Sequence, residues 1–320
     1  MNKKRIQFID LAKGFAILLV IIGHIETIPY VKHLIYSFHM PLFFILSGYF
    51  FKNEESFRKA FKKLFSTLII PYLIVGGIMR VYAMTENTLN GQPFSYDDLL
   101  SLPFVLWKWK GDVVSAGAIW FLPVLFLSKL YLLQLLRYKN YLFILILGAL
   151  LSIWFVKKTG IIIPLGILQG LVCAVFVYVG SIWHKYYFFS FKLSWLLLGV
   201  LWIGVLLSVR NVNLAVRINH YSMGLFTLIE TCFISYLFCA TCQKFDSLNF
   251  FNKFKEKLIW CGRYSLIILC IHSIEGRFHW FSLPHEYFIA EVIIRIGYIS
   301  LLTWLCTKWK PTQWVFHIKK

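Results

Sequence analysis

The first apolar segment of the chain carries three side chains that could do chemistry. Its sequence, FIDLAKGFAILLVIIGH, sets Asp10, Lys13 and His24 among aliphatic and small residues. Lys13 and His24 are eleven residues apart, so on an α-helix they share one face about 16 Å apart, and Asp10 can pair with Lys13 on the same stripe. Because histidine transfers protons near neutral pH, His24 is a candidate general base. The spacing alone is equally compatible with an ion pair at one membrane surface and a histidine at the other.

Three other apolar segments carry polar or aromatic side chains at the ends that would lie level with His24. These residues are Ser37 and His39 in SFHMPLFFILSG, Trp120 in IWFLPVLF, and His272 with Glu275 in LCIHSIE, while Glu26 follows the first segment. A neighbouring carboxylate can fix the tautomer of a histidine and raise its basicity, which favours proton transfer from a hydroxyl group. An interfacial histidine and an aromatic-belt residue are the structural alternatives for His39 and Trp120.

Composition indicates that membrane-spanning helices position these side chains. Of the 320 residues, 59% are apolar, 19% are aromatic and only 15% are charged, and the mean hydropathy is +0.70. A soluble domain of this size could not bury so much apolar surface. The formal net charge of +19 does not indicate a nucleic-acid-binding groove, because the basic residues fall in short runs between apolar stretches, as membrane topology requires.

We therefore expect an all-α, polytopic integral membrane protein with about ten transmembrane helices in one bundle. Each expected span is long enough to cross a hydrocarbon core of about 30 Å, although the fifth is only marginal. Pro41 fits the first turn of the second helix, where its missing N–H costs nothing. The ten expected spans are residues 8–25, 34–51, 64–83, 119–136, 141–156, 161–183, 193–209, 222–242, 258–275 and 287–306.

Loop charges predict that the N- and C-termini both lie in the cytoplasm. With the N-terminus inside, twenty basic residues fall in cytoplasmic segments and eight in outer segments, as the positive-inside rule requires. No small-x-small cleavage site follows the first apolar run, so we expect a retained helix and not a signal peptide. The outer loop at 84–118 is too short for an extracytoplasmic catalytic domain, so we expect residues 1–320 to form a single domain with its chemistry among the helices.

Five segments together resemble one family, the membrane-bound acyltransferase family 3, and within it the branch of fucose O-acetylases and polysaccharide O-acyltransferases. The segments are the first helix, SFHMPLFFILSG, the basic run leading into KLFSTLIIPY, WFL at Trp120, and GRYSLIILCIH. The resemblance covers nearly the whole chain, and the first two helices are its most specific part. The family's hallmark is a basic residue, ten intervening positions and a histidine, which are Lys13 and His24 here. The usual basic residue is arginine, and lysine replaces its planar fork with a point charge.

The resemblance implies an O-acyltransferase that moves an acyl group, usually acetyl from cytoplasmic acetyl-CoA, to a hydroxyl of a cell-surface or lipid-linked glycan. It also implies that the protein lies in a bacterial-type cell (inner) membrane and that the acceptor hydroxyl is on the outer side. His24 would take the proton of the acceptor, and Lys13 with Asp10 would hold or steer the donor. His39 and His272 would act as a second base, an orienting group or an oxyanion partner.

Further residues are candidates for binding the two substrates. A cytoplasmic basic run suits the phosphates of coenzyme A, although positive-inside topology explains such a run as well. The candidates for coenzyme A, besides Lys13, are Arg58, Lys62, Lys63 and Arg263, and those for the acceptor are Ser37, Trp120, Glu275 and Glu26. In the last span, Glu291 and Arg295 have the spacing of a structural ion pair.

The expected partners are the lipid bilayer, acyl-CoA and a glycan acceptor, with no nucleic acid. A homo-oligomer and polysaccharide-assembly partners stay open. We expect no metal, because nothing in the sequence brings His24, His39 and His272 within about 4 Å of one another to form a zinc site. Two other functional classes also stay open. A glycan transporter or flippase predicts inverted repeats and broken helices near the midplane, and a non-catalytic subunit of a polysaccharide export system needs no convergent histidines.

Overall fold

The computed structural model describes residues 6–25, 29–52, 56–91, 117–186, 189, 193–208, 214–248, 250–278 and 283–318. Helices make up almost all of the described chain. Its elements are α1 (Gln7–His24), α2 (Pro29–Tyr36), α3 (His39–Tyr49), α4 (Phe57–Leu64), the π-helix η1 (Phe65–Ile69), α5 (Ile70–Leu89), α7 (Phe121–Leu135), α8 (Tyr141–Thr159), η3 (Pro164–Gly166), α9 (Ile167–Lys185), α10 (Trp195–Ser208), β1 (Leu214–Ala215), η6 (Val216–Ile218), β2 (His220–Tyr221), α11 (Leu225–Asp246), α12 (Asn252–Arg263), α13 (Ser265–Phe278), η7 (His285–Tyr287), α14 (Phe288–Lys308) and α15 (Lys310–Val315).

The protein is an all-α, polytopic membrane protein, as predicted. In the described part of the chain, seven helices are long and apolar enough to cross a membrane, or eight if a bent helix pair counts as one span. The fifth expected span is longer than predicted, because α8 continues through Lys157 and Lys158 to Thr159, and Gly160 follows in the left-handed conformation with φ 66°. Glycine adopts that conformation without strain, so it ends the helix cleanly.

The second expected span is broken into α2 and α3 by a proline. Pro41 lies in the first turn of α3, as predicted, and it has no N–H to donate to the Ser37 carbonyl four residues earlier. The hydroxyl of Thr231 on α11 donates to that carbonyl oxygen at 3.0 Å and supplies the missing bond. The chain therefore turns at Ser37 and Phe38 without leaving the buried acceptor unsatisfied, and α3 keeps only 11 residues.

Two further expected spans differ for other reasons. α12 and α13 are bent by 74° at Tyr264, so the ninth expected span is a broken one. The seventh corresponds to α10, which has 14 residues, and at 1.5 Å per residue a straight helix of that length falls short of the hydrocarbon core.

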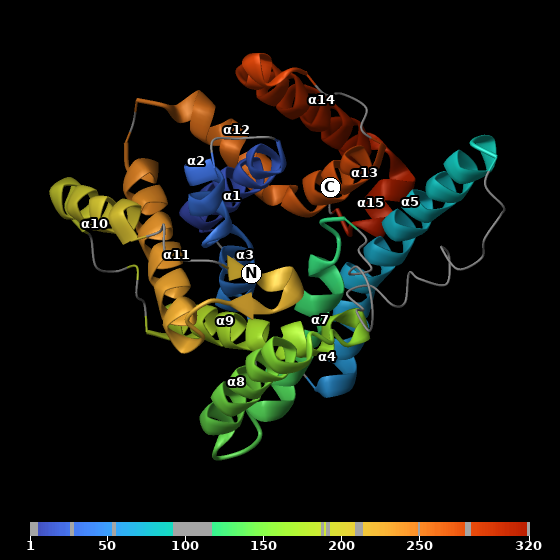
Figure 1. Ribbon diagram of the computed structural model, residues 1–320. Helices are drawn as coiled ribbons and strands as arrows, with labels where there is room; N and C mark the ends of the chain where they lie inside the picture. The colour runs from blue at the N-terminus through green and yellow to red at the C-terminus, as the bar shows by residue number, and fades with distance from the viewer. Residues whose placement is uncertain are drawn as a thin grey trace.

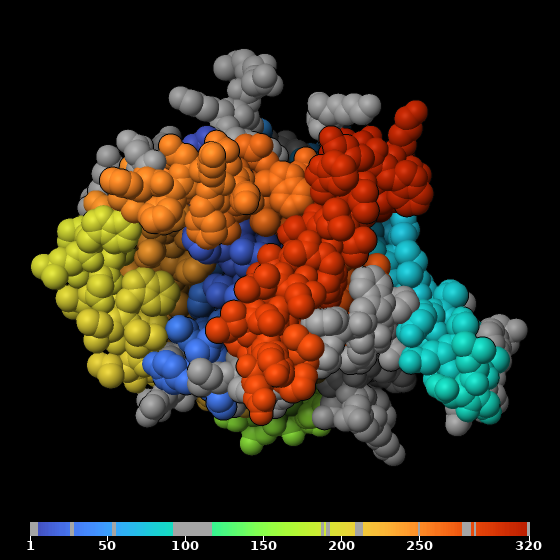
Figure 2. Space-filling model, turned by 90° about the horizontal axis from the view of Figure 1, so that it is seen from above, coloured from blue at the N-terminus to red at the C-terminus, as the bar shows by residue number. Residues whose placement is uncertain are grey.

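Helices α1 and α3 lie at the centre of the helix arrangement (Figure 1). α1 contacts α3, α11, α12 and α13, and α3 contacts α9 as well. Figure 2 shows α10 in yellow at one side, α5 in cyan projecting at the other side, and α14 crossing the face between them. The central position of α1 explains why Lys13 and His24 can both face the interior of the bundle.

Glycines allow the central helices to approach their neighbours backbone to backbone. A Cβ atom added at Gly48 on α3 would overlap the Val177 carbonyl oxygen, and one added at Gly180 on α9 would overlap the Ile45 carbonyl oxygen. α1 and α12 repeat this arrangement, because a Cβ at Gly14 would overlap the carbonyl oxygen of residue 258, and one at Gly262 that of residue 10. Small residues at such crossings are typical of helix packing in membranes.

A short antiparallel hairpin follows α10 and is tied to two helices. β1 and β2 pair Leu214 with Tyr221, and Asn219 turns the chain with φ 56°. The Asn219 amide donates to Ser152 Oγ on α8 at 2.9 Å, and Gln169 on α9 donates to the Arg217 carbonyl oxygen at 3.1 Å. These buried side chains hold the η6 turn in one position.

The close crossing of α3 and α9 predicts a large loss of stability in Gly48→Ala. The new methyl group would push two backbones apart, and overpacking of this kind costs about 1–3 kcal/mol or more. The melting temperature of the detergent-solubilised protein, followed by fluorescence-detected gel filtration, should fall clearly.

Gly199→Ala in α10 is the matched control, because a Cβ at Gly199 meets nothing within 4 Å. Alanine is the better helix former, so its melting temperature should stay the same or rise. Equal melting temperatures for the two variants would contradict the assigned role of the α3–α9 crossing.

Candidate active site

One cavity of about 590 Å³ collects most of the candidate residues. Its walls come from α1, α2, α3, α5, α13, α14, the segment before α7 and the hairpin after α10. Five of the predicted site residues line it: His24, His39, Trp120, His272 and Glu275. Segments that are far apart in the sequence therefore meet at one place, as their predicted depths require.

Three histidines and a tyrosine form a row in this cavity. The ring centroids of His24 and His272 are 5.0 Å apart, those of His24 and Tyr36 are 6.1 Å apart, and those of Tyr36 and His39 are 4.9 Å apart. His24 is open to the cavity, whereas His39 and His272 are each only 3% exposed. Of these three histidines, the most accessible is thus the one at the end of α1.

Backbone carbonyls fix the tautomers of two of the rings. Nδ1 of His24 lies 2.8 Å from the Val20 carbonyl oxygen, and Nδ1 of His39 lies 2.8 Å from that of Ile35. A carbonyl oxygen can only accept, so the proton of each neutral ring is assigned to Nδ1. Each Nε2 atom is then left with a lone pair, and that of His24 can accept a proton from a hydroxyl group in the cavity.

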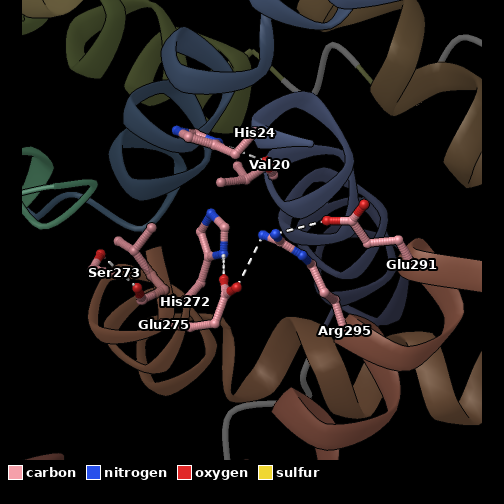
Figure 3. A network of polar contacts seen from close by, with 8 residues as sticks. Val20, His24, His272, Ser273, Glu275, Glu291 and Arg295 are labelled. Atoms are coloured by element: carbon pink, nitrogen blue, oxygen red, sulfur yellow. Dashed lines mark hydrogen bonds and ion pairs between the residues drawn. The ribbon is translucent and has the colours of Figure 1, made fainter. Parts of the chain in front are cut away.

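A buried ionic network supports His272. Nδ1 of His272 lies 3.3 Å from Glu275 Oε2, and Arg295 of α14 forms ion pairs with Glu275 at 2.9 Å and with Glu291 at 2.7 Å. Figure 3 shows Glu275 between His272 and Arg295, and Arg295 between the two carboxylates. The spacing of Glu291 and Arg295 predicts their ion pair. Arg295 also lines the cavity, where it pairs with Glu275. Because Glu275 is fully buried, this network holds the carboxylate in one orientation beside the imidazole.

A second, smaller cavity lies beside Lys13. Its volume is about 150 Å³, and its lining is mostly apolar, with Ile17, Phe121 and Leu269 among the contributors. Met40 lines both cavities. Lys13 and His24 therefore face two separate spaces along one side of α1, with the Met40 side chain at their junction.

Asp10 forms an ion pair with an arginine of another helix. Its carboxylate lies 3.8 Å from Nε of Arg263 at the end of α12. The ammonium group of Lys13 lies 5.2 Å from the centroid of the Phe50 ring, a cation–π distance. The expected pairing of Asp10 with Lys13 stays a prediction.

The other candidates that the structure describes do not line the larger cavity. Ser37 is 1% exposed and donates its hydroxyl to the Leu34 carbonyl oxygen at 2.7 Å, which makes it a local structural group. The basic candidates Arg58, Lys62 and Lys63 lie on exposed positions of α4 and line neither cavity. Glu26 lies outside the described residues.

Among the lining residues that the sequence did not predict, Tyr36, Arg80 and Arg217 have side chains suited to binding a polar substrate. Arg80 could have been found, because it is a charged residue within the apolar 33-residue span Phe57–Leu89. A charge inside the membrane is energetically costly, so such a residue is a candidate for function. Tyr36 and Arg217 carry no comparable signal. In the described part of the chain, no group of three or more His, Cys, Asp or Glu side chains could hold a metal ion. The expected absence of a bound metal stays a prediction.

Comparisons with known proteins identify the family of this chain. The model of acyltransferase family 3, described as an acyltransferase domain, matches residues 6–308. The nodulation protein NolL of Mesorhizobium japonicum is 25% identical to this chain over 216 residues, which cover 63% of this chain and 52% of NolL. The chain thus spans about half the length of this curated relative. No solved structure matches it.

The family match extends from the start of α1 to the end of α14 and so includes every helix that lines the two cavities. The chain belongs to the acyltransferase 3 family.

Proposed function

We propose that this acyltransferase is an O-acyltransferase that moves an acyl group, with acetyl the expected one, from cytoplasmic acyl-CoA to a hydroxyl of a cell-surface or lipid-linked glycan. The observation that carries the proposal is the open His24 ring, whose Nδ1 is committed to the Val20 carbonyl and whose Nε2 is available in a cavity large enough for a sugar. A hydroxyl nucleophile needs such a base.

In the proposed reaction, Nε2 of His24 takes the hydroxyl proton while the acceptor oxygen bonds to the thioester carbonyl carbon. His272, which lies 3.3 Å from Glu275 and lines the same cavity, would orient the acceptor or stabilise the developing oxyanion. The C–S bond then breaks, and the proton on His24 passes to the departing sulfur of coenzyme A. The imidazole returns to its neutral form, and the acyl group remains on the glycan.

The donor is proposed to reach this cavity from the side of Lys13. The thioester end would occupy the smaller cavity, and the phosphates of coenzyme A would meet Arg263 and the exposed basic residues of α4, Arg58, Lys62 and Lys63. With these basic residues in the cytoplasm, the larger cavity faces the outer side of the cell (inner) membrane, and both termini lie inside.

A glycan transporter is the second candidate, because the 74° bend between α12 and α13 is a broken helix of the kind transporters use at their substrate sites. A transporter would move labelled glycan into proteoliposomes in the absence of acetyl-CoA. The proposed enzyme would not.

The proposed base predicts that His24→Ala abolishes transfer of labelled acetyl from acetyl-CoA to cell-envelope glycan. General-base catalysis contributes about 10²- to 10⁴-fold to a rate, so the initial rate in membranes should fall by at least about 100-fold at equal expression. His184→Ala replaces an exposed histidine on α9 that lines neither cavity and should keep the wild-type rate. Full labelling by His24→Ala would rule out the assignment.

The buried network predicts a loss of kcat in Glu275→Gln with little change in either KM. Glutamine keeps the size of the side chain but removes the carboxylate charge that lies 3.3 Å from His272 Nδ1 and orients the ring, so only the chemical step should slow, by about 10- to 100-fold. Glu230→Gln is the control, because Glu230 on α11 accepts from Ser208 at 3.3 Å and lies outside both cavities. Equal effects of the two substitutions on kcat would show that Glu275 only stabilises the fold.

The smaller cavity predicts that Lys13→Met raises KM for acetyl-CoA by about tenfold, because a hydrogen bond to a charged group contributes about 1.5–3 kcal/mol. Lys13→Arg retains the charge and should stay within about threefold of wild type. Lys158→Met, at the exposed end of α8, should leave this KM unchanged. A raised KM for the glycan, with no change for the donor, would place Lys13 in the acceptor site instead.

A further inference from the structure

Three arginines line the larger cavity from three different elements. Arg80 comes from α5, Arg217 from the η6 turn of the hairpin, and Arg295 from α14. A charged side chain within a membrane bundle is costly, so such residues are the first candidates for a function. Arg295 forms ion pairs with Glu275 and Glu291. Arg80 and Arg217 bring two further guanidinium-bearing side chains to the lining of the same cavity.

The hairpin holds Arg217 in a fixed place at the cavity. Its carbonyl oxygen accepts from the buried Gln169 amide at 3.1 Å, and the adjoining turn is tied through Asn219 to Ser152, which itself donates to the Leu168 carbonyl oxygen at 2.8 Å. The Arg217 side chain is exposed and lines the same cavity as His24 and Tyr36. Buried polar groups thus fix the backbone from which the Arg217 side chain reaches the cavity, which lowers the entropic cost of binding a ligand there.

The chemistry of the guanidinium group determines what Arg80 and Arg217 can bind. Each guanidinium presents five N–H donors in a planar fork that matches the two oxygens of a carboxylate or phosphate, and a group with five donors can serve a ligand together with other partners. The neutral rings of His24 and His39 add no opposing negative charge, and Glu275 is already engaged by Arg295. The cavity therefore favours an anionic ligand over a neutral one of equal size.

We propose that the acceptor carries an oxyanion, a sugar carboxylate or a phosphate, which Arg80 and Arg217 bind so that a hydroxyl of the same molecule lies at Nε2 of His24. This inference rests on the proposed function and narrows its acceptor from any glycan to an acidic or phosphate-bearing one. The anion determines which acceptor binds and how it is oriented, while the proton transfer stays with His24.

Equilibrium binding to the purified protein tests the inference without any transfer step. The probes are p-nitrophenyl β-D-glucuronide, the matched neutral p-nitrophenyl β-D-glucoside, and p-nitrophenyl phosphate. Wild type should bind the glucuronide or the phosphate at least about tenfold more tightly than the glucoside, as expected for one charge-assisted bidentate contact. Preference for the glucuronide identifies a sugar carboxylate, and preference for the phosphate identifies a phosphate group.

The variants Arg80→Gln and Arg217→Gln should each remove most of this preference while leaving glucoside binding unchanged. Arg217 is exposed, so its variant should fold normally even if Arg80→Gln does not. Arg137→Gln, at an exposed position after α7, is the control and should keep the preference.

Two outcomes would overturn the inference: wild type binding all three probes equally, or a preference that survives in Arg217→Gln and in a folded Arg80→Gln. The proposed function is judged separately by acetyl transfer. Transfer without anion preference would remove only the inference about the acceptor. Anion preference without transfer would remove only the acyltransferase reaction.

Discussion

The candidate site depends on two backbone crossings that only glycine permits. At the crossing of α1 and α12, Gly262 meets the carbonyl of Asp10, and the next residue, Arg263, consequently lies 3.8 Å from the Asp10 carboxylate. At the crossing of α3 and α9, Gly48 meets Val177. In lipid, the hydrophobic effect does not drive helices together, because the lipid tails are as apolar as the helix surfaces. Close van der Waals packing must therefore supply much of the free energy of association between helices. The two crossings hold α1 and α3 in place, and therefore also the histidines at the end of one helix and the start of the other.

Interrupted helices are the second condition for the site. His24 is the last residue of α1, His39 is the first residue of α3, and His272 follows the bend at Tyr264. A helix end frees side chains and backbone groups to face an enclosed space, and irregular backbone at membrane depth is tolerated only where protein or water satisfies it. The Thr231 hydroxyl on the Ser37 carbonyl shows how this chain meets that requirement.

Much of this architecture could be predicted from the sequence, and the missing part has physical reasons. Hydropathy locates apolar segments, and depth along the membrane normal brought His24, His39 and His272 to one level. Hydropathy and depth do not specify which helices are neighbours in the bundle or which faces they turn to one another. The ion pair of Asp10 with Arg263 on α12 and the position of Arg217 at the cavity therefore do not follow from the sequence. The break before α3 could have been foreseen, because Pro41 removes the bond to residue 37, but a threonine donor 194 positions along the chain could not.

The division into two cavities bears directly on the proposed reaction. A thioester exposed to an aqueous cavity can be hydrolysed, because water competes with the glycan hydroxyl as the nucleophile. In the proposed reaction, the mostly apolar lining beside Lys13 would keep water from the donor, and the acyl group would pass Met40, which lines both spaces. Methionine has an unbranched and adaptable side chain, so it can separate the two spaces in the absence of an acceptor and yield when one is bound. If the acceptor's anion is held by arginines on α5 and the hairpin, its binding energy orients a hydroxyl at His24 before the donor is exposed, which favours transfer over hydrolysis.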